Sequence, residues 1–452
     1  MLSRRALLRT TAASATAVTA TSATTGALST HHLDEGALAS VASAEVVHTF
    51  VSMPDFFNGD VGDLRGLPTW DGGANSVNAS WEVAIARCLD AVAAHRPDSV
   101  FVAGDMVEGR WNIDSDRRAL FGPVRQGIDA ESLRMCRAAI TRAGNTYYDY
   151  YRSLFDSRGL TVYPAVGDHE ILDDRPGPLN DRWSPSGRYV AGRYKGQPDN
   201  RYYLVDHAKD VWARHWTTAP DGSPRFANRP ERSHAARTAY AAHLGPGLTL
   251  VTVDPFTKTP HGVRLGVFGH QLDWLRHTIT RAKAAGRVVI VQGHIPVMQP
   301  YRSWVSGDLR VPEGRASEFY RVLENAGADF LFTGEVHDTT VIQRGRRAPI
   351  QISHGCIFRY GFNYLVGRVL ADGTTHLEYY EVPMVNASHA RGLWSTDATK
   401  RQRTHIEYGD PVHRGTLRVK NRAILTRTKK LGVYHPTTDT WGYAVSNRTA
   451  VS

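Results

Sequence analysis

The sequence predicts an α/β fold in which two β-sheets pack as a sandwich flanked by helices, with a ligand site at the carboxyl ends of the strands. Apolar, strand-like runs alternate along the chain with segments of helical periodicity. This alternation is typical of βαβ units with parallel strands. Several strand-like runs also end in a glycine followed by an acidic residue or a histidine. Open α/β sheets bind their ligands at that edge.

The first half of the chain is expected to form strands and helices in turn, and then a cap over the site. Asn78 or Ser80 can cap the first helix, because both side chains accept hydrogen bonds from free backbone amides. From about 171 to 237 the chain is rich in Pro, Gly, Arg and aromatic residues without clear periodicity, and we interpret it as the cap. The elements expected before it are a strand over 46–52, a helix over 80–95, a strand over 99–103, a helix over 130–158 and a strand over 160–166.

The second half repeats the alternation and ends in short strands. Those last strands are expected to be antiparallel and to complete the second sheet. The expected elements are a strand over 248–253, a helix over 271–285, a strand over 288–292, a helix over 316–326, a strand over 329–333 and short strands over 340–342, 350–353, 364–369 and 375–382.

Five segments place acidic or imidazole side chains directly after these strands. A polar residue that caps a strand end is the alternative for any one of them, but five in order favour a metal site. Carboxylates together with imidazoles suit Zn, Mn and Fe, and a glycine before the ligand lets the backbone turn sharply. The segments contain Asp55, Gly104-Asp105, Gly167-Asp168-His169-Glu170, Gly293-His294 and Gly334-Glu335-Val336-His337.

In order and spacing, these segments resemble the five blocks of the calcineurin-like metallophosphoesterase family, D-x-H, G-D-x-x-[DE], G-N-H-[DE], G-H and G-H-x-H, over roughly residues 46–380. The resemblance implies two divalent or trivalent metal ions that hydrolyse phosphate mono- or diesters by metal-hydroxide attack. It also implies that His169 is the general acid, oriented by Glu170 or another nearby carboxylate. The implied metal ligands are the shared Asp105, then Asp168, His294 and Glu335 for the second ion, and Asp55 and His337 for the first.

Three residues depart from the family pattern. Phe57 stands where D-x-H has its histidine, so Asn58, Asp60 or Asp63 would have to complete the first metal site. Asp168 replaces an asparagine and Glu335 a histidine; both changes keep a donor and add negative charge, which favours oxygen-loving ions. The expected ions are Mn, Fe or Zn, and the added negative charge favours the first two over zinc. The alternative is a degenerate relative that has lost one metal and acts as a binding protein of the cell envelope.

Arg110 is the best placed cation to bind the phosphoryl group of a substrate, because it follows Asp105 in the same loop. The alternative is that Arg110 pairs with Glu108 or another surface carboxylate.

Three cysteines, Cys88, Cys136 and Cys356, do not describe a disulfide framework. Cys88 lies on the apolar face of its helix and is expected to be buried.

The N-terminus predicts export. Residues 3–9, with Arg4-Arg5, form a twin-arginine pattern, and an Ala/Thr/Ser-rich stretch follows, with cleavage candidates ending at Ala39 or Ala44. That stretch is too weakly apolar to cross a membrane, and no transmembrane span is expected in the mature chain. The protein is therefore expected in the periplasm, the cell envelope or the extracellular space. The expected organisation is an export signal over 1–44, a catalytic domain over 45–385 and a basic extension over 386–452.

The positive charge of the chain is concentrated at its end. Of a net charge of +10, residues 386–452 contribute +8, from twelve Lys and Arg against four Asp and Glu. Such an extension attracts anionic polymers through salt-sensitive electrostatics, so an anionic cell-envelope polymer is an expected partner beside a small phosphoester substrate. A solvated extension is the alternative. The sequence contains no motif for specific nucleic-acid recognition, no Walker A loop, no dinucleotide fingerprint and no Gly-x-Ser-x-Gly.

Overall fold

The computed structural model divides the chain into two units, Met1–Ser43 and Ala44–Ser452, and the described residues all belong to the second. Asn78, Cys356 and the export signal lie outside the described residues. The structure describes residues 45–53, 79–107, 109–113, 119, 121–173, 183–190, 194–298, 309–336, 339–345, 348–353, 361–387, 406–428, 434–435 and 440–443.

The first sheet has the first strand of the chain in its interior. β1 (Val46–Met53) pairs in parallel with β2 (Ser99–Val102), which pairs in parallel with β3 (Val162–Pro164). On its other side β1 pairs antiparallel with a late strand, β12 (Gly361–Leu370). The sheet continues antiparallel through β13 (Thr374–Ala387), β15 (Val412–Lys420) and β16 (Ala423–Arg427), and β14 (Ile406–Tyr408) also pairs with β13.

The second sheet is parallel in its centre. Strands β5 (Leu248–Thr252), β8 (Val288–Gln292), β9 (Phe330–Thr333) and β11 (Ile350–Ser353) run side by side in the same direction. Antiparallel strands flank them: β4 (Tyr240–Leu244) on one side, and β10 (Thr339–Ile342), β18 (Thr440–Tyr443) and β17 (Tyr434–His435) on the other. A separate hairpin is formed by β6 (Phe256–Thr259) and β7 (Gly262–Leu265).

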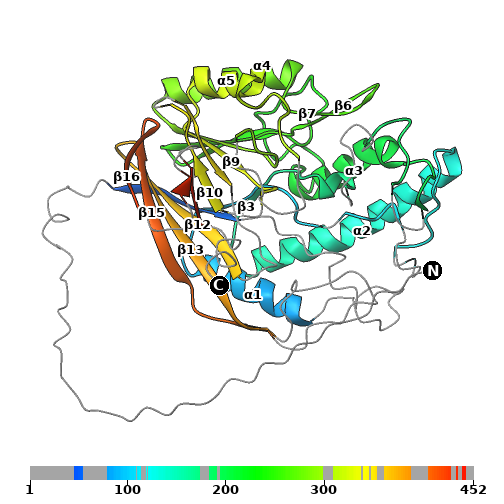
Figure 1. Cartoon of the computed structure of the whole chain (residues 1–452), viewed down its shortest axis with the longest axis horizontal. Helices are drawn as coiled ribbons and strands as arrows, with labels where there is room; N and C mark the ends of the chain where they lie inside the picture. Colours follow the sequence, from blue (N-terminus) through cyan, green and yellow to red (C-terminus); the bar gives the residue numbers. More distant parts are fainter. Residues whose placement is uncertain are drawn as a thin grey trace, which may run out of the picture. The chain divides into compact units, whose positions relative to one another are not determined.

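Helices cover both outer sides of the sandwich (Figure 1). α1 (Ala79–Ala93), α2 (Ala130–Asp156) and α3 (Arg201–Trp216) lie on one side, and α4 (Gly269–Ala284) and α5 (Glu318–Ala326) on the other. Their ends follow local chemistry. Asp129 caps α2 by accepting a hydrogen bond from the amide of Ser132, and Gly327 ends α5 with a φ of 94°. Short 3₁₀ helices span His169–Ile171 and Gly314–Ala316.

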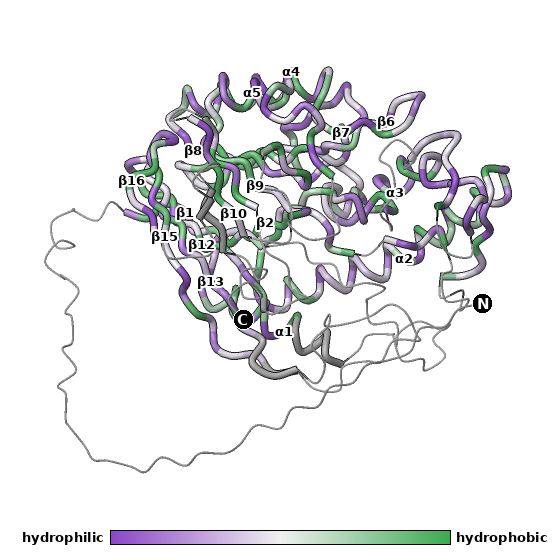
Figure 2. The backbone as a smooth tube through the Cα atoms, in the orientation of Figure 1, coloured by the Kyte–Doolittle hydropathy of each residue, from purple (hydrophilic) through white to green (hydrophobic). Residues whose placement is uncertain are grey.

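An apolar core fills the space between the sheets. The ring of Phe50 on β1 stacks on Phe101 of β2 at 4.9 Å and meets Phe332 of β9 at 6.0 Å, so the two sheets touch through aromatic side chains. Along β15, Leu417 and Val419 are buried and alternate with half-exposed polar residues. Figure 2 shows the hydrophobic stretches on the central strands and hydrophilic ones on the outer helices. The predicted two-sheet α/β sandwich is confirmed.

Three expectations about elements need correction. β12 and β13 join the first sheet, not the second, and β11 runs parallel to β9. Part of the predicted cap is the helix α3, whose apolar pattern is interrupted by the buried Arg201 and Lys209. Part of the predicted C-terminal extension is not a separate appendage, because β15 and β16 extend the first sheet and β17 and β18 the second. The alternating apolar residues of β15 become buried because this strand joins the first sheet.

Two further findings concern cysteines and the membrane. Cys88 and Cys136 are buried free thiols, which confirms the expectation for Cys88. None of the described helices combines the length and the apolar character that a membrane span requires.

Candidate metal centre

Four of the predicted metal ligands meet where the carboxyl ends of strands from both sheets come together. Asp105 follows β2 and Asp168 follows β3, whereas His294 follows β8 and Glu335 follows β9. All four side chains are buried, and one ligand atom from each lies within 4.8 Å of the others. A buried group of three carboxylates and one imidazole matches the donors of a hard or borderline metal ion.

His294 presents the nitrogen that a metal would bind. Its Nδ1 lies 2.8 Å from the carbonyl oxygen of Ala103, and because a carbonyl only accepts, Nδ1 carries the hydrogen. Nε2 lies 2.8 Å from a carboxylate oxygen of Asp168, 3.2 Å from one of Asp105 and 3.6 Å from one of Glu335, and in the neutral imidazole its lone pair faces them. Lone pairs that face each other in a buried place repel unless a positive charge lies among them. The residues therefore fit a metal ion.

Asp105 contributes differently through its two oxygens. Oδ1 accepts a hydrogen bond of 3.1 Å from the backbone amide of His169. Oδ2 is buried and accepts no hydrogen bond from the described part of the chain. An acceptor of this kind is costly to bury without a partner, and a cation is the partner that its neighbours select.

The backbone around these ligands is strained and tightly packed. Asp105 has a φ of 55° and Glu335 a φ of 60°, a left-handed conformation that costs non-glycine residues of order 1–3 kcal/mol. Gly167 leaves no room for a side chain, because an added Cβ would lie 2.1 Å from Oδ1 of Asp105. Gly167 is thus required where two ligand loops touch.

Glu170 holds these loops together. Its carboxylate accepts hydrogen bonds from the backbone amides of Asp105 at 2.9 Å, Met106 at 2.7 Å and Gly167 at 2.6 Å. Burial and the charge of Asp105 raise the pKa of Glu170 to about 7. We predicted that Glu170, or another nearby carboxylate, orients His169; for Glu170 this needs correction, because both its oxygens accept hydrogen bonds from backbone amides. Glu170 thus connects the loop that carries Asp105 to the loop that carries Asp168.

His169 lies beside the four donors. Its Nε2 is 3.9 Å from Oδ2 of Asp105 and 4.0 Å from Oδ2 of Asp168. The side chain is 17% exposed, whereas the side chain of His294 is fully buried. Solvent therefore reaches the imidazole of His169, which suits a group that meets a substrate.

The structure describes only one of the remaining predicted site residues, Arg110. Asp55, Asn58 and His337 lie outside the described residues, as does Glu108. Arg110 is described as a half-buried residue of the loop after β2. Sequence reasoning missed Gln351, a buried residue of β11 whose Oε1 accepts hydrogen bonds from the amides of Val297 and Met298, in the loop that follows His294. The only feature of the sequence that could have indicated this role is a single glutamine within an apolar strand.

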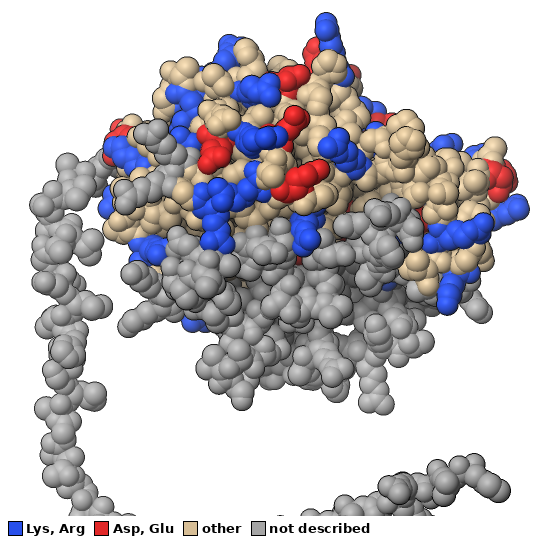
Figure 3. Space-filling view, turned by 45° about the horizontal axis from the view of Figure 1, so that its top comes forward, with Lys and Arg blue, Asp and Glu red and all other residues tan. Residues whose placement is uncertain are grey.

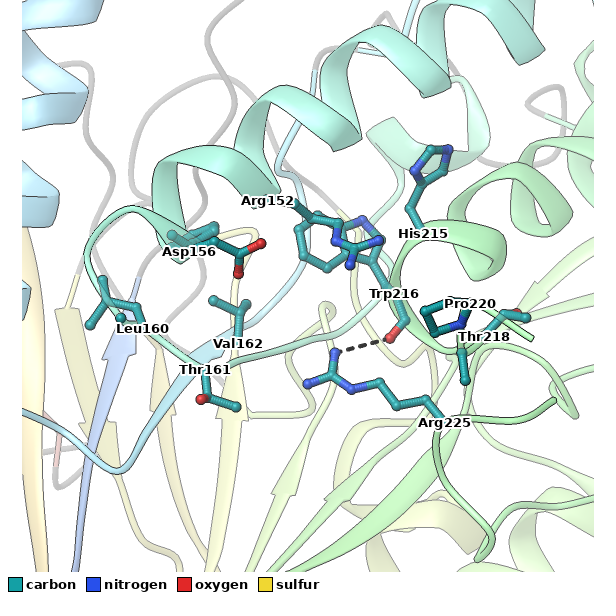
Figure 4. A pocket seen from close by; sticks show the side chains of 13 residues that line it. Arg152, Asp156, Leu160, Thr161, Val162, His215, Trp216, Thr218, Pro220 and Arg225 are labelled. Atoms are coloured by element: carbon teal, nitrogen blue, oxygen red, sulfur yellow. Dashed lines mark hydrogen bonds between the residues drawn. The ribbon is translucent and has the colours of Figure 1, made fainter. Parts of the chain in front are cut away.

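A separate cavity of about 510 Å³ lies at the amino end of β3, next to the last turns of α2 and α3 (Figure 4). Arg225 donates to the carbonyl of Trp216 at 3.3 Å, where α3 ends, and its guanidinium also lies over the ring of Tyr163. A cation at this place stabilises the negative end of the helix dipole. Since Asp168 follows the opposite end of β3, this cavity is distinct from the candidate metal centre.

The α/β sandwich and its buried carboxylate and imidazole donors define a class, the proteins with a candidate metal site at the strand ends of two facing sheets. A family model narrows this class: the calcineurin-like phosphoesterase model matches residues 59–338, more than half of the chain. The chain belongs to the calcineurin-like phosphoesterase family. Membership supports metal-dependent phosphoester hydrolysis as the general activity, and the family is dimetal-dependent. A search of curated proteins found no match.

Solved structures resemble this one at low identity. A dimetal phosphatase from Danio rerio has 14% identity over 75% of this chain and 96% of that one, with a TM-score of 0.43. GAP50, the anchor in the inner membrane complex of Plasmodium, has 10% identity over 81% of this chain and 89% of that one, with a TM-score of 0.35. A putative 5'-nucleotidase from Staphylococcus aureus has 12% identity over 71% of this chain and 50% of that one, with a TM-score of 0.34.

Proposed function

We propose that the protein hydrolyses phosphate mono- or diesters at a dinuclear metal centre, with His169 as the general acid. One observation carries the proposal: donor atoms of Asp105, Asp168, His294 and Glu335 converge within 4.8 Å in a buried place, although they come from four separate loops. Buried carboxylates that repel one another persist only where they serve a positive charge, and hard or borderline ions such as Mn, Fe or Zn suit this donor set.

Different residues of the chain are proposed to bind metal, to bind the phosphoryl group and to donate a proton. When bound, the metal ions supply Lewis-acid neutralisation of the phosphoryl oxygens and activate water. Asp105 is assigned the shared ligand position, because its Oδ2 faces Nε2 of His294 and lies next to His169. Asp55, Asn58 and His337 are proposed to complete the other ion's ligands, and Arg110 is proposed to bind the phosphoryl group. His169 holds a proton at Nε2 and delivers it to the oxygen of the leaving group.

His169→Ala is expected to lower turnover of alkyl and phenyl phosphates by about 10²–10⁴-fold, and turnover of nitrophenyl esters much less. The reason is that a poor leaving group needs the proton, whereas nitrophenolate departs without it. Steady-state rates on mono- and diesters of both kinds check this, using a chain that begins at Glu45 and is loaded with Mn²⁺.

The matched control is His277→Ala, which removes an exposed histidine from α4 and should leave every rate unchanged. Equal losses on good and poor leaving groups would argue against the general-acid role. If the wild-type chain, loaded with metal, hydrolyses neither ester class, the phosphoesterase proposal fails. The degenerate binding protein of the cell envelope then becomes the better account.

Export through the twin-arginine pathway is proposed from Arg4 and Arg5 together with the Ala/Thr/Ser-rich stretch that follows them. The pathway carries folded proteins, which suits a protein that acquires metal before it crosses the membrane. A variant with Arg4→Lys and Arg5→Lys should accumulate as precursor in the cytoplasm. Unchanged export of that variant, measured by fractionation and immunoblotting, would contradict the proposal.

Residues 386–452 are proposed to contact an anionic polymer of the cell envelope, on the strength of their charge of +8. Within the described part of this region, Arg414 pairs with Glu381 and Lys420 with Asp372, so these two cations are partly engaged. On the face shown in Figure 3, basic side chains lie among acidic ones. Binding to isolated envelope should weaken as salt rises; retention that does not depend on salt would exclude an electrostatic contact.

A further inference from the structure

The start of α3 contacts both loops of the first sheet that carry candidate metal ligands. One loop holds Asp105 and continues to Asn112, and the other is the turn from Asp168 to Asp173. Side chains from both reach the residues that precede or begin the helix. We call this group the α3 clamp, and its buried members are Asn112, Asp173, Tyr189, Asp199, Asn200 and Arg201.

Arg201 ties the helix to the Asp168 turn. Its Nη1 donates to Oδ1 of Asp173 at 2.8 Å, and its Nε donates to the carboxylate of Asp199 at 2.9 and 3.0 Å. The backbone amide of Asp173 in turn donates to the carbonyl of Asp168 at 3.0 Å. The guanidinium thus reaches a candidate metal ligand through one intervening residue, and a planar guanidinium fixes both carboxylates in orientation.

Asn200 ties the helix to the Asp105 loop. Its Oδ1 accepts hydrogen bonds from Nδ2 of Asn112 at 2.9 Å and from the hydroxyl of Tyr189 at 3.0 Å. Asn112 also donates to that hydroxyl at 2.8 Å. Asn200 occupies the N-cap position, yet its side chain makes no capping hydrogen bond to the helix. An asparagine at this position usually caps the helix, so its use here serves the contact with Asn112.

The two loops that the clamp joins also touch each other under strain. Leu172 has a φ of 75°, a conformation that a leucine adopts only when its surroundings hold it there. The indole nitrogen of Trp183 donates to the carbonyl of the neighbouring Ile171 at 2.9 Å. At Gly109, an added Cβ would lie 1.6 Å from the carbonyl oxygen of His169, so the two loops are in direct contact. A turn in such a conformation needs external restraint to stay in place.

We propose that Asn200 and Arg201 are positioning residues that set the Asp105 loop and the Asp168–His169 turn against each other, and thereby set the metal affinity of the centre. The effect on metal affinity rests on the proposed function, whereas the effect on how firmly the two loops are held in place does not. Residues that orient metal ligands from outside typically change metal affinity by about 10–100-fold when they are removed.

The test removes the contact of the α3 clamp with each loop in a separate variant. Asp173→Ala removes the link to the turn and leaves the Arg201–Asp199 pair intact, and Asn112→Ala removes the link to the Asp105 loop. Each variant is expected to bind Mn²⁺ about 10-fold more weakly by calorimetry. In the metal-free protein, amide hydrogen exchange should accelerate in residues 105–113 and 168–173. The double variant should lose little more than either single variant, because contacts within one unit are not additive.

The matched control is Lys283→Met, which breaks a pair with the buried Asp329 before β9, at the end of the second sheet away from the centre. It should lower the melting temperature without changing Mn²⁺ affinity or exchange in the two loops. The proposal is overturned if Asp173→Ala and Asn112→Ala match this control. If Asp173→Ala fails to fold, Asp173→Asn should show smaller changes in the same direction, and unchanged exchange there overturns the proposal.

Failure of the proposed function gives a different result. A wild-type chain that binds no Mn²⁺ contradicts the metal centre, and hydrogen exchange in the metal-free variants still decides the clamp. Faster exchange confined to the two loops supports it, and unchanged exchange overturns it.

Discussion

Asp105→Asn is expected to remove metal from the centre and to lower phosphoesterase activity by about 10³-fold or more, since a lost ligand forfeits several kcal/mol of transition-state stabilisation. The metal-free protein should nevertheless become more stable. An amide at this position removes one of three crowded negative charges, and its NH₂ group can donate to Nε2 of His294, which lies 3.2 Å from Oδ2. Elemental analysis after exposure to Mn²⁺ and thermal unfolding in chelator measure the two effects.

The matched control is Asp156→Asn, an exposed carboxylate in the last turn of α2, which should change neither quantity. Wild type should retain two ions per chain. One retained ion would mean that no residue replaces the histidine missing at Phe57. Full metal content in Asp105→Asn would show that Asp105 is not a ligand.

Glu170→Ala is expected to lower the free energy of unfolding by about 3 kcal/mol or more, because it leaves three buried backbone amides without an acceptor. Metal affinity should fall as well, since the amides belong to the loops that carry Asp105 and Asp168. Urea unfolding and Mn²⁺ titration give the two values. Glu170→Gln should fall between wild type and Glu170→Ala, as its carbonyl still accepts while its NH₂ group faces a donor.

Glu131→Ala provides the comparison for Glu170. This glutamate lies exposed in the first turn of α2, where it pairs with Arg134, and its loss should change stability by no more than about 0.5 kcal/mol. If Glu170→Ala behaves like Glu131→Ala, the three amides find other acceptors and Glu170 does not hold the loops together.

The motifs at strand ends predicted that these side chains lie near one another, because parallel strands place their carboxyl ends at one edge of a sheet. Asp105, Asp168, His294 and Glu335 were chosen from local sequence, and the sheets bring all four into one cluster. Glu170 was misread because its partners are backbone amides, which no pattern of side chains records. The α3 clamp was missed for a related reason: the burial of Arg201 depends on Asp173, which is distant in sequence, and a buried arginine breaks the apolar periodicity that reveals a helix.

The short strands show a second limit. Short strand-like runs predicted β12 and β13 as strands, but such a run alone does not tell which sheet a strand joins. The same limit applies to residues 386–452, where charge dominated the interpretation and the buried Leu417 and Val419 were overlooked.

The place of β1 has a consequence for how the chain matures during synthesis. β1 pairs with β12, with Val46 opposite Leu370, so the first sheet stays open along this strand until the ribosome has passed both ligand loops of the second sheet. Pairings between such distant segments form slowly, and an unpaired edge invites association with other chains. A nascent chain that stalls before β12 therefore carries every described donor residue but exposes the edge of β1, so shortened translation products should aggregate and not assemble a partial centre.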